Sequence, residues 1–208
     1  MCADARLPKI KICGLTNLED ARAAADLGAD FLGFVFAPSP RRLSVEKAGT
    51  FWKNLPCGVP RVGVFRDQKA REVSAVVERL SLDYLQFHGA ESPAVCRSFG
   101  LPVIRALSPT EVKGLRVFEL YRQVAAYFLV DLPKEGDGAE VLPREIARAS
   151  LGLGKPTLLA GGLDPGSIGG FVRDLRPFGV DVARGVESEP GKKDFGKMRE
   201  FFARARER

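Results

Sequence analysis

The feature that most constrains the fold of this chain is the repetition of short runs rich in Val, Ile, Leu and Phe. These runs lie at residues 9–13, 31–36, 61–65, 84–88, 103–107, 127–132, 156–161 and 179–184. Nearly continuous apolar strands that alternate with helical stretches are typical of a parallel sheet covered by helices. Because there are eight such units, the sequence predicts a closed (β/α)8 barrel rather than an open doubly wound sheet.

The stretches between the runs carry helix start and stop signals. In residues 16–28, Thr16 or Asn17 can cap the first turn and Gly28 can end the helix. Segments 68–80, 91–100 and 164–179 repeat this plan. A chain of 208 residues gives about 26 residues per unit, which leaves little room for insertions. We therefore expect one α/β domain over residues 1–208, a parallel eight-stranded TIM barrel.

Composition excludes several classes of protein. The chain is 45% hydrophobic and 28% charged, as in ordinary globular proteins. We see neither an apolar leader nor a run approaching the roughly 18 apolar residues of a membrane span. The net charge of +6 comes from Lys and Arg scattered among acidic residues. We expect a cytoplasmic monomer or homodimer that binds a small anionic substrate, and neither nucleic acid nor a membrane.

The cysteines and the histidine limit metal and redox chemistry. Cys2, Cys13, Cys57 and Cys96 form no C-x-x-C pair, and His88 is the one histidine of the chain. A zinc cluster of His and Cys ligands is therefore excluded, and we expect neither metal nor cofactor. In a reducing cytosol an even number of cysteines does not imply disulfides. Cys57 and Cys96 are typical of small buried or half-buried residues.

Glycines follow the last two predicted strands. Gly161 and Gly162 come after the seventh run, and Gly185 comes after the eighth. Glycines let backbone N–H groups approach an anion closely, and these two strand ends form the usual phosphate site of such barrels. The glycine pair could also be a simple turn into a helix. The combination with Gly185 favours a phosphorylated substrate.

Two residues suited to acid–base chemistry end distant strands. Cys13 ends the first run and Asp131 lies in the sixth, so their side chains could approach a substrate from two sides. A thiolate is a competent base when cations or backbone dipoles lower its pKa, and a shielded carboxyl group can keep a proton to donate. Each alone could be structural, Cys13 as a buried thiol and Asp131 as a helix cap. Their pairing at one barrel mouth favours catalysis.

Two further candidates lie at strand ends. Arg41, in the segment PSPRRLS, could bind a carboxylate through two parallel hydrogen bonds. His88 ends the fourth run, where a single histidine is more often a hydrogen-bonded structural residue than a ligand.

Several motifs occur together in one order along the whole chain. They are KICGLTNLEDA at 11–21, GADFLGFVF at 28–36, SPRRLS at 39–44, RVGVF at 61–65, QFHG at 86–89, LAGGLDP at 159–165 and GVDVARGVESEPGKKD at 179–194. With these motifs the chain resembles the phosphoribosylanthranilate isomerase family of tryptophan biosynthesis. The resemblance implies an Amadori rearrangement of N-(5-phosphoribosyl)anthranilate, without metal or cofactor.

The resemblance also implies roles for individual residues. Cys13 corresponds to the general base that takes a proton from C2 of the ribose, and Asp131 to the general acid that protonates the ring oxygen. Arg41 matches the arginine near the anthranilate end, and Gly162 with Gly185 matches the phosphate loops. The other expected substrate contacts are His88, Gly161 and Asp181.

The chain departs from the family pattern at three places. The segment after Asp131, residues 132–143, is short and has no Trp. Ala183 and Arg184 stand where the family commonly has two serines, and we expect the Arg184 side chain to point away from the barrel mouth. The SPRRLS loop is one residue shorter than in some relatives.

Other functions fit a phosphate-binding barrel. An indole-glycerol-phosphate synthase usually needs a catalytic lysine and further N-terminal residues, and a ribulose-phosphate epimerase needs metal-binding histidines that this chain lacks. A catalytically silent barrel that binds phosphorylated metabolites or nucleic acid is the alternative outside enzymes. Retention of both Cys13 and Asp131 is evidence against it.

Overall fold

The computed structural model describes residues 7–131 and 141–207, in which β1 to β8 close into a parallel barrel in chain order. The strands are β1 (Lys9–Ile12), β2 (Phe31–Val35), β3 (Arg61–Phe65), β4 (Tyr84–Phe87), β5 (Val103–Leu107), β6 (Ala125–Val130), β7 (Thr157–Leu159) and β8 (Gly179–Val182). The barrel closes where β1 pairs with β8, with Lys11 opposite Asp181. The predicted (β/α)8 barrel is confirmed.

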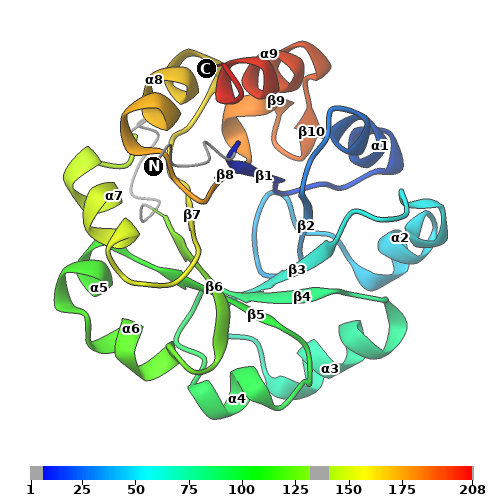
Figure 1. The fold of residues 1–208 in the computed structure, drawn as a ribbon. Coiled ribbons are helices and arrows are strands. Elements are labelled where there is room, and N and C mark those ends of the chain that lie inside the picture. Colours follow the sequence, from blue (N-terminus) through cyan, green and yellow to red (C-terminus); the bar gives the residue numbers. More distant parts are fainter. Residues whose placement is uncertain (1–6, 132–140, 208) are drawn as a thin grey trace.

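Helices form a ring around the barrel (Figure 1). They are α1 (Leu18–Asp26), α2 (Val45–Gly49), α3 (Ala70–Arg79), α4 (Pro93–Arg97), α5 (Pro109–Gly114), α6 (Arg116–Tyr121), α7 (Arg144–Leu151), α8 (Pro165–Leu175) and α9 (Phe195–Ala205), with 3-10 turns η1 (Trp52–Asn54) and η2 (Arg184–Val186). A hairpin of β9 (Glu187–Glu189) and β10 (Lys192–Lys193) precedes α9. Because α9 packs on both α8 and α1, the last helix closes the ring against the first.

The helix starts follow the capping signals of the sequence. Asn17 caps α1, where its side chain accepts a hydrogen bond from the Asp20 amide, and Gly28 follows the helix with a φ of +88°. Ser92 and Asp164 cap α4 and α8 in the same way. A capping side chain of this kind stabilises a helix by about 1 kcal/mol, because it satisfies an amide that has no partner within the helix.

Each barrel strand separates an inner core from an outer one. Inside, Val62, Ile104, Leu129 and Leu158 are completely buried. The outward faces of the strands, for example Phe128, pack under the helices. Burial of one such side chain contributes about 1.5–3 kcal/mol. The interior is therefore a packed core and not a channel.

Some strand boundaries differ from the predicted runs. The sixth strand begins at Ala125 and ends at Val130, so Asp131 follows the strand instead of belonging to it. The eighth ends at Val182, because Ala183 has a φ of −125° and a ψ of −78° and the chain then enters η2. Strand alternation therefore does not determine where the exposed Arg184 points.

Two further observations concern the described residues. Among them, no helix combines the length and the apolar character that crossing a membrane requires. Cys13, Cys57 and Cys96 are free thiols. Cys96 is buried as predicted, whereas Cys57 is exposed, because it lies in the loop before β3 and not in a strand or helix of the core.

Candidate active site

A cavity of about 820 Å³ opens at the carboxyl ends of the barrel strands. Every strand end contributes to its lining: Cys13 after β1, Arg41 after β2, Arg66 after β3, His88 after β4, Ser108 after β5, Asp131 after β6, Gly161 and Gly162 after β7, and Arg184 and Gly185 after β8. This is the end of the barrel at which such folds place their chemistry. All the predicted site residues line this one cavity, Asp181 included.

Cys13 is fixed where β1 gives way to the loop before α1. Its amide donates to the carbonyl of Val182 over 2.8 Å, and only 7% of the residue is exposed. Gly33 on β2 leaves room for its side chain, since a Cβ at that position would lie 3.0 Å from both Cys13 Sγ and Lys11 Nζ. The thiol therefore lies beside a buried ammonium group.

Opposing effects act on the Cys13 thiol. Burial raises its pKa above the ordinary value, Asp181 raises it further, and the ammonium groups of Lys11 and Lys193 lower it. Burial alone would lower the pKa of Lys11, but the charges of Asp181 and Cys13 outweigh it and raise that pKa. Lys11 therefore stays charged, 2.7 Å from Asp181 Oδ1, and favours the thiolate whenever Cys13 loses its proton.

The charged groups around Cys13 do not balance without it. The thiol interacts with the cations Lys11, Arg41 and Lys193 and with the carboxylate of Asp181. The carboxylate of Glu187 is bonded to two of these cations, Arg41 and Lys193. Three positive and two negative charges leave one positive charge. A thiolate at Cys13 would neutralise that charge, but burial is the larger effect and keeps the pKa of the thiol above its ordinary value.

Asp131 and His88 lie together on the opposite side of the mouth. The Asp131 amide donates to the carbonyl of Leu107 over 3.1 Å, and its Oδ2 lies 3.6 Å from His88 Nε2. His88 Nδ1 is 3.4 Å from Gln86 Nε2, whose side chain is buried beneath the mouth. His88, which the sequence allows as either a structural residue or a ligand, thus lies beside the candidate acid Asp131. Gln86 was missed because a polar residue within a strand carries no sequence signal of its own.

The glycines after β7 and β8 form a backbone cradle. Gly161 and Gly162 have φ values of +96° and +66°, which other residues rarely adopt. A Cβ on Gly185 would lie 2.0 Å from the carbonyl oxygen of Leu163, so the two loops pack backbone against backbone. The amino end of α8 follows directly, capped by Asp164. This arrangement can present amide groups to a phosphate.

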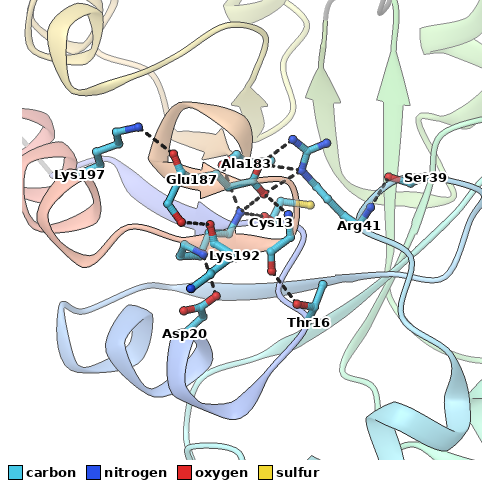
Figure 2. Close-up of polar contacts among 12 residues, drawn as sticks. Cys13, Thr16, Asp20, Ser39, Arg41, Ala183, Glu187, Lys192 and Lys197 are labelled. Atoms are coloured by element: carbon cyan, nitrogen blue, oxygen red, sulfur yellow. Dashed lines mark hydrogen bonds and ion pairs between the residues drawn. The ribbon is translucent and has the colours of Figure 1, made fainter.

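Arg41 binds a carboxylate, as its side chain suggested, but the partner is Glu187 of the same chain. Arg41 Nε lies 2.8 and 3.0 Å from the two carboxylate oxygens of Glu187, and Nη2 lies 2.6 Å from Oε2 (Figure 2). These bonds use one edge of the guanidinium group and leave Nη1 for a ligand in the cavity. Glu187 therefore fixes the orientation in which Arg41 faces the cavity.

The sequence did not predict that Lys11, Lys193 and Glu187 belong to the site. Lys11 shares the first run with a second lysine, the exposed Lys9, and Glu187 and Lys193 lie in a charged segment that is typical of a solvent-exposed surface. Their partners are 4 to 180 residues away in the chain. The one available signal was alternation, which places Lys11 on the same face of β1 as Cys13.

No group of three or more His, Cys, Asp or Glu side chains suited to holding a metal ion occurs within residues 7–131 and 141–207. The donors at the mouth include the thiol of Cys13, the imidazole of His88, the carboxylate of Asp131 beside that imidazole, and the carboxylate of Asp181, which is paired with Lys11.

The fold and the site together define a closed parallel (β/α)8 barrel with a cavity at the carboxyl ends of its strands, lined by a cysteine, an aspartate and the glycines that follow β7 and β8. The profile of the N-(5'-phosphoribosyl)anthranilate (PRA) isomerase family matches residues 10–204. The chain belongs to this family.

Individual members of the family are similar to this chain over nearly their whole length. An N-(5'-phosphoribosyl)anthranilate isomerase of Acidithiobacillus ferrooxidans is 44% identical over 201 residues, covering 95% of this chain and 97% of that protein. A crystal structure from Thermotoga maritima, described as monomers generated from a dimeric isomerase, has a TM-score of 0.82 at 33% identity, covering 95% and 98% of the two chains. Another isomerase structure, in complex with reduced 1-(o-carboxyphenylamino)-1-deoxyribulose 5-phosphate, has a TM-score of 0.82 at 34% identity over 95% and 98%.

Proposed function

We propose that the chain converts N-(5'-phosphoribosyl)anthranilate into 1-(2-carboxyphenylamino)-1-deoxyribulose 5-phosphate, the aldose-to-ketose step of tryptophan biosynthesis. The observation that carries the proposal is the placement of Cys13 and Asp131 at the ends of β1 and β6, facing one cavity beside the glycine cradle. Family membership supports the same reaction. The reaction moves protons within one substrate, so the proposal requires neither metal nor cofactor.

Two proton transfers account for the reaction. The carboxyl group of Asp131 gives its proton to the furanose ring oxygen, so that the C1–O bond breaks and a C1=N iminium group forms. The Cys13 thiolate then removes the proton from C2, and the resulting enolamine tautomerises to the ketone when the C2 hydroxyl loses a proton and C1 gains one. Cys13 ends the cycle protonated and Asp131 ionised, so a proton returns from thiol to carboxylate before the next turnover.

The remaining predicted contacts divide between the two ends of the substrate. Gly161, Gly162 and Gly185 hold the phosphate through backbone amides. Arg41 binds the anthranilate carboxylate through Nη1. Asp181 contacts the substrate from β8, and its carboxylate also keeps Lys11 charged beneath Cys13.

His88 contacts the substrate near Asp131, which lies 3.6 Å away. The segment after Asp131 that departs from the family pattern lies at 132–143, and residues 132–140 of it fall outside the described residues.

We further propose that the enzyme acts in the cytoplasm as a monomer or homodimer. Sedimentation at micromolar concentration would establish the assembly state.

The test is a fluorescence assay that follows the disappearance of phosphoribosylanthranilate. Cys13→Ser should keep the fold and lower kcat about 10²–10⁴-fold, because a hydroxyl of much higher pKa cannot replace the thiol as a base. Asp131→Asn should lower kcat much more than it weakens substrate binding, since an amide has no acidic proton to give. Cys57→Ser, at an exposed thiol, is the matched control and should behave as wild type. A folded wild-type protein without turnover would refute the proposal.

A further inference from the structure

The β9–β10 hairpin, residues 187–193, is held against the catalytic end of β1 by bonds that the reaction itself does not use. Thr16 Oγ1 donates to the carbonyl of Gly191 over 2.6 Å, and the Lys193 amide donates to Asp20 Oδ2 over 2.8 Å (Figure 2). The hairpin therefore docks on the loop and helix that follow Cys13.

Lys193 ties three chain segments together from inside the protein. Its completely buried ammonium group donates to the carbonyl of Cys13 over 2.6 Å, to the carbonyl of Ala183 over 3.1 Å and to Glu187 Oε1 over 2.9 Å. An ammonium group has three protons, so each proton has one acceptor. Lys193 thus links the end of β1 to the end of β8.

Glu187 extends this link to the loop after β2. The same carboxylate that accepts from Lys193 binds the guanidinium edge of Arg41, and it also accepts from the Gly191 amide over 3.3 Å. The pKa of Glu187 is lowered: burial raises it, and the hydrogen bond from Arg41 and the charge of Lys193 more than offset that rise. Glu187 therefore stays ionised and connects Lys193 to Arg41.

We propose that Lys193 and Glu187 are positioning residues, and that the hairpin carries them as one tether that holds Cys13 and Arg41 at a fixed separation. Lys193 holds the backbone carbonyl of Cys13 in place, and Glu187 fixes the orientation of the Arg41 guanidinium group. The inference rests on the proposed function for the roles of Cys13 and Arg41. The bonds lie among the described residues and do not depend on which substrate the cavity holds.

The hairpin offers a matched control for each residue. Lys192 and Glu189 have the same side chains as Lys193 and Glu187, but they are exposed and form an ion pair with each other across 3.8 Å on the solvent side of the hairpin. Lys192→Met and Glu189→Gln therefore change the charge of the hairpin as Lys193→Met and Glu187→Gln do, without touching the tether.

The first measurement needs no turnover. The rate at which iodoacetamide alkylates Cys13 is followed by peptide mass spectrometry as a function of pH, in each variant. In Lys193→Met the alkylation curve should move to higher pH, because the thiolate loses a neighbouring cation. The charged groups that face Cys13 in this experiment are Lys11 on β1, Arg41 after β2, Asp181 on β8, Glu187 on β9 and Lys193 on β10.

The second measurement separates kcat from KM. Lys193→Met should lower kcat by about tenfold or more, since a shift of 1 Å in a reacting group costs about 10²-fold. Glu187→Gln should instead raise KM about tenfold with a smaller change in kcat, because Arg41 loses its charged partner. Both control variants should stay within about twofold of wild type.

Each outcome decides the question. A folded Lys193→Met variant with unchanged kcat and alkylation curve overturns the tether, and so does an equal loss in Lys192→Met. If Lys193→Met does not fold, an unchanged KM in Glu187→Gln overturns it alone. Absence of turnover in wild type refutes the proposed function, whereas a shifted Cys13 alkylation curve in Lys193→Met still supports the tether.

Discussion

Gly185→Ala should separate the two loops of the phosphate cradle. The new Cβ would lie 2.0 Å from the Leu163 carbonyl oxygen and 2.9 Å from the α-carbon of Asp164. Both neighbours are backbone atoms and cannot rotate away, so one loop must move by at least about 1 Å to reach ordinary contact.

The displacement has a kinetic and a thermodynamic consequence. A hydrogen bond to a charged group contributes about 1.5–3 kcal/mol, so loss of one amide–phosphate bond should raise KM about 10- to 100-fold. Overpacking costs about 1–3 kcal/mol, and about 1 kcal/mol lowers the Tm of a chain of this length by about 2–4 °C. We therefore expect a folded protein with a Tm lowered by about 2–12 °C.

Steady-state kinetics on phosphoribosylanthranilate and thermal unfolding by circular dichroism measure both effects. Gly170→Ala is the matched control, because its nearest neighbours would be the flexible ends of Arg144 and Arg173 at 3.8 and 4.0 Å. Inside α8 this change should leave KM alone and stabilise the helix by about 0.5–1 kcal/mol. A KM within twofold of wild type in folded Gly185→Ala would refute the role given to the cradle.

Four further predictions concern the mouth and the thiols. The pH profile of kcat/KM should rise through the pKa of Cys13, which burial raises above the ordinary value of a thiol, and an acidic limb that levels off below pH 7 would contradict the direction assigned to burial. Gly33→Ala should lower kcat more than it changes KM, because the new Cβ would lie 3.0 Å from both Cys13 Sγ and Lys11 Nζ and would displace them. The control variant Gly49→Ala has open space around the new Cβ and should leave both kcat and KM unchanged. Arg184→Ser should leave KM almost unchanged, because glycine amides hold the phosphate, and a tenfold rise without a change in assembly would place this guanidinium on the phosphate. Burial raises the pKa of the Cys96 thiol to about 11, so at pH 8 iodoacetamide should label exposed Cys57 and leave Cys96 unmodified, as peptide mapping would reveal.

The sequence predicts the barrel well because its signals are local. Apolar runs mark the strands, and Asn17, Ser92 and Asp164 mark helix starts through bonds to amides three residues away. The ends of strands are harder to predict, because an apolar run in the sequence can extend beyond the last residue with strand geometry. The chain turns out of β8 after Val182, although the letters of the run continue to Arg184.

The residues at the mouth divide in the same way. Cys13, Asp131 and the glycines follow strands and could be proposed from their positions alone. Glu187 and Lys193 could not, because their meaning depends on Arg41 and Cys13, which lie 146 and 180 residues away in the chain. Isolated from these partners, a glutamate and a lysine in a charged segment look like surface residues.

The pairing of β1 with β8 also has a consequence during synthesis on the ribosome. Lys11 meets Asp181 only after 170 further residues have been made, which takes about 10–30 s at typical elongation rates. Throughout that interval the nascent chain carries β1 without its β8 neighbour and Cys13 without the lysine that will hold its carbonyl. Of the three cysteines that the structure describes, Cys13 is therefore synthesised first and is exposed longest to oxidants before the barrel closes.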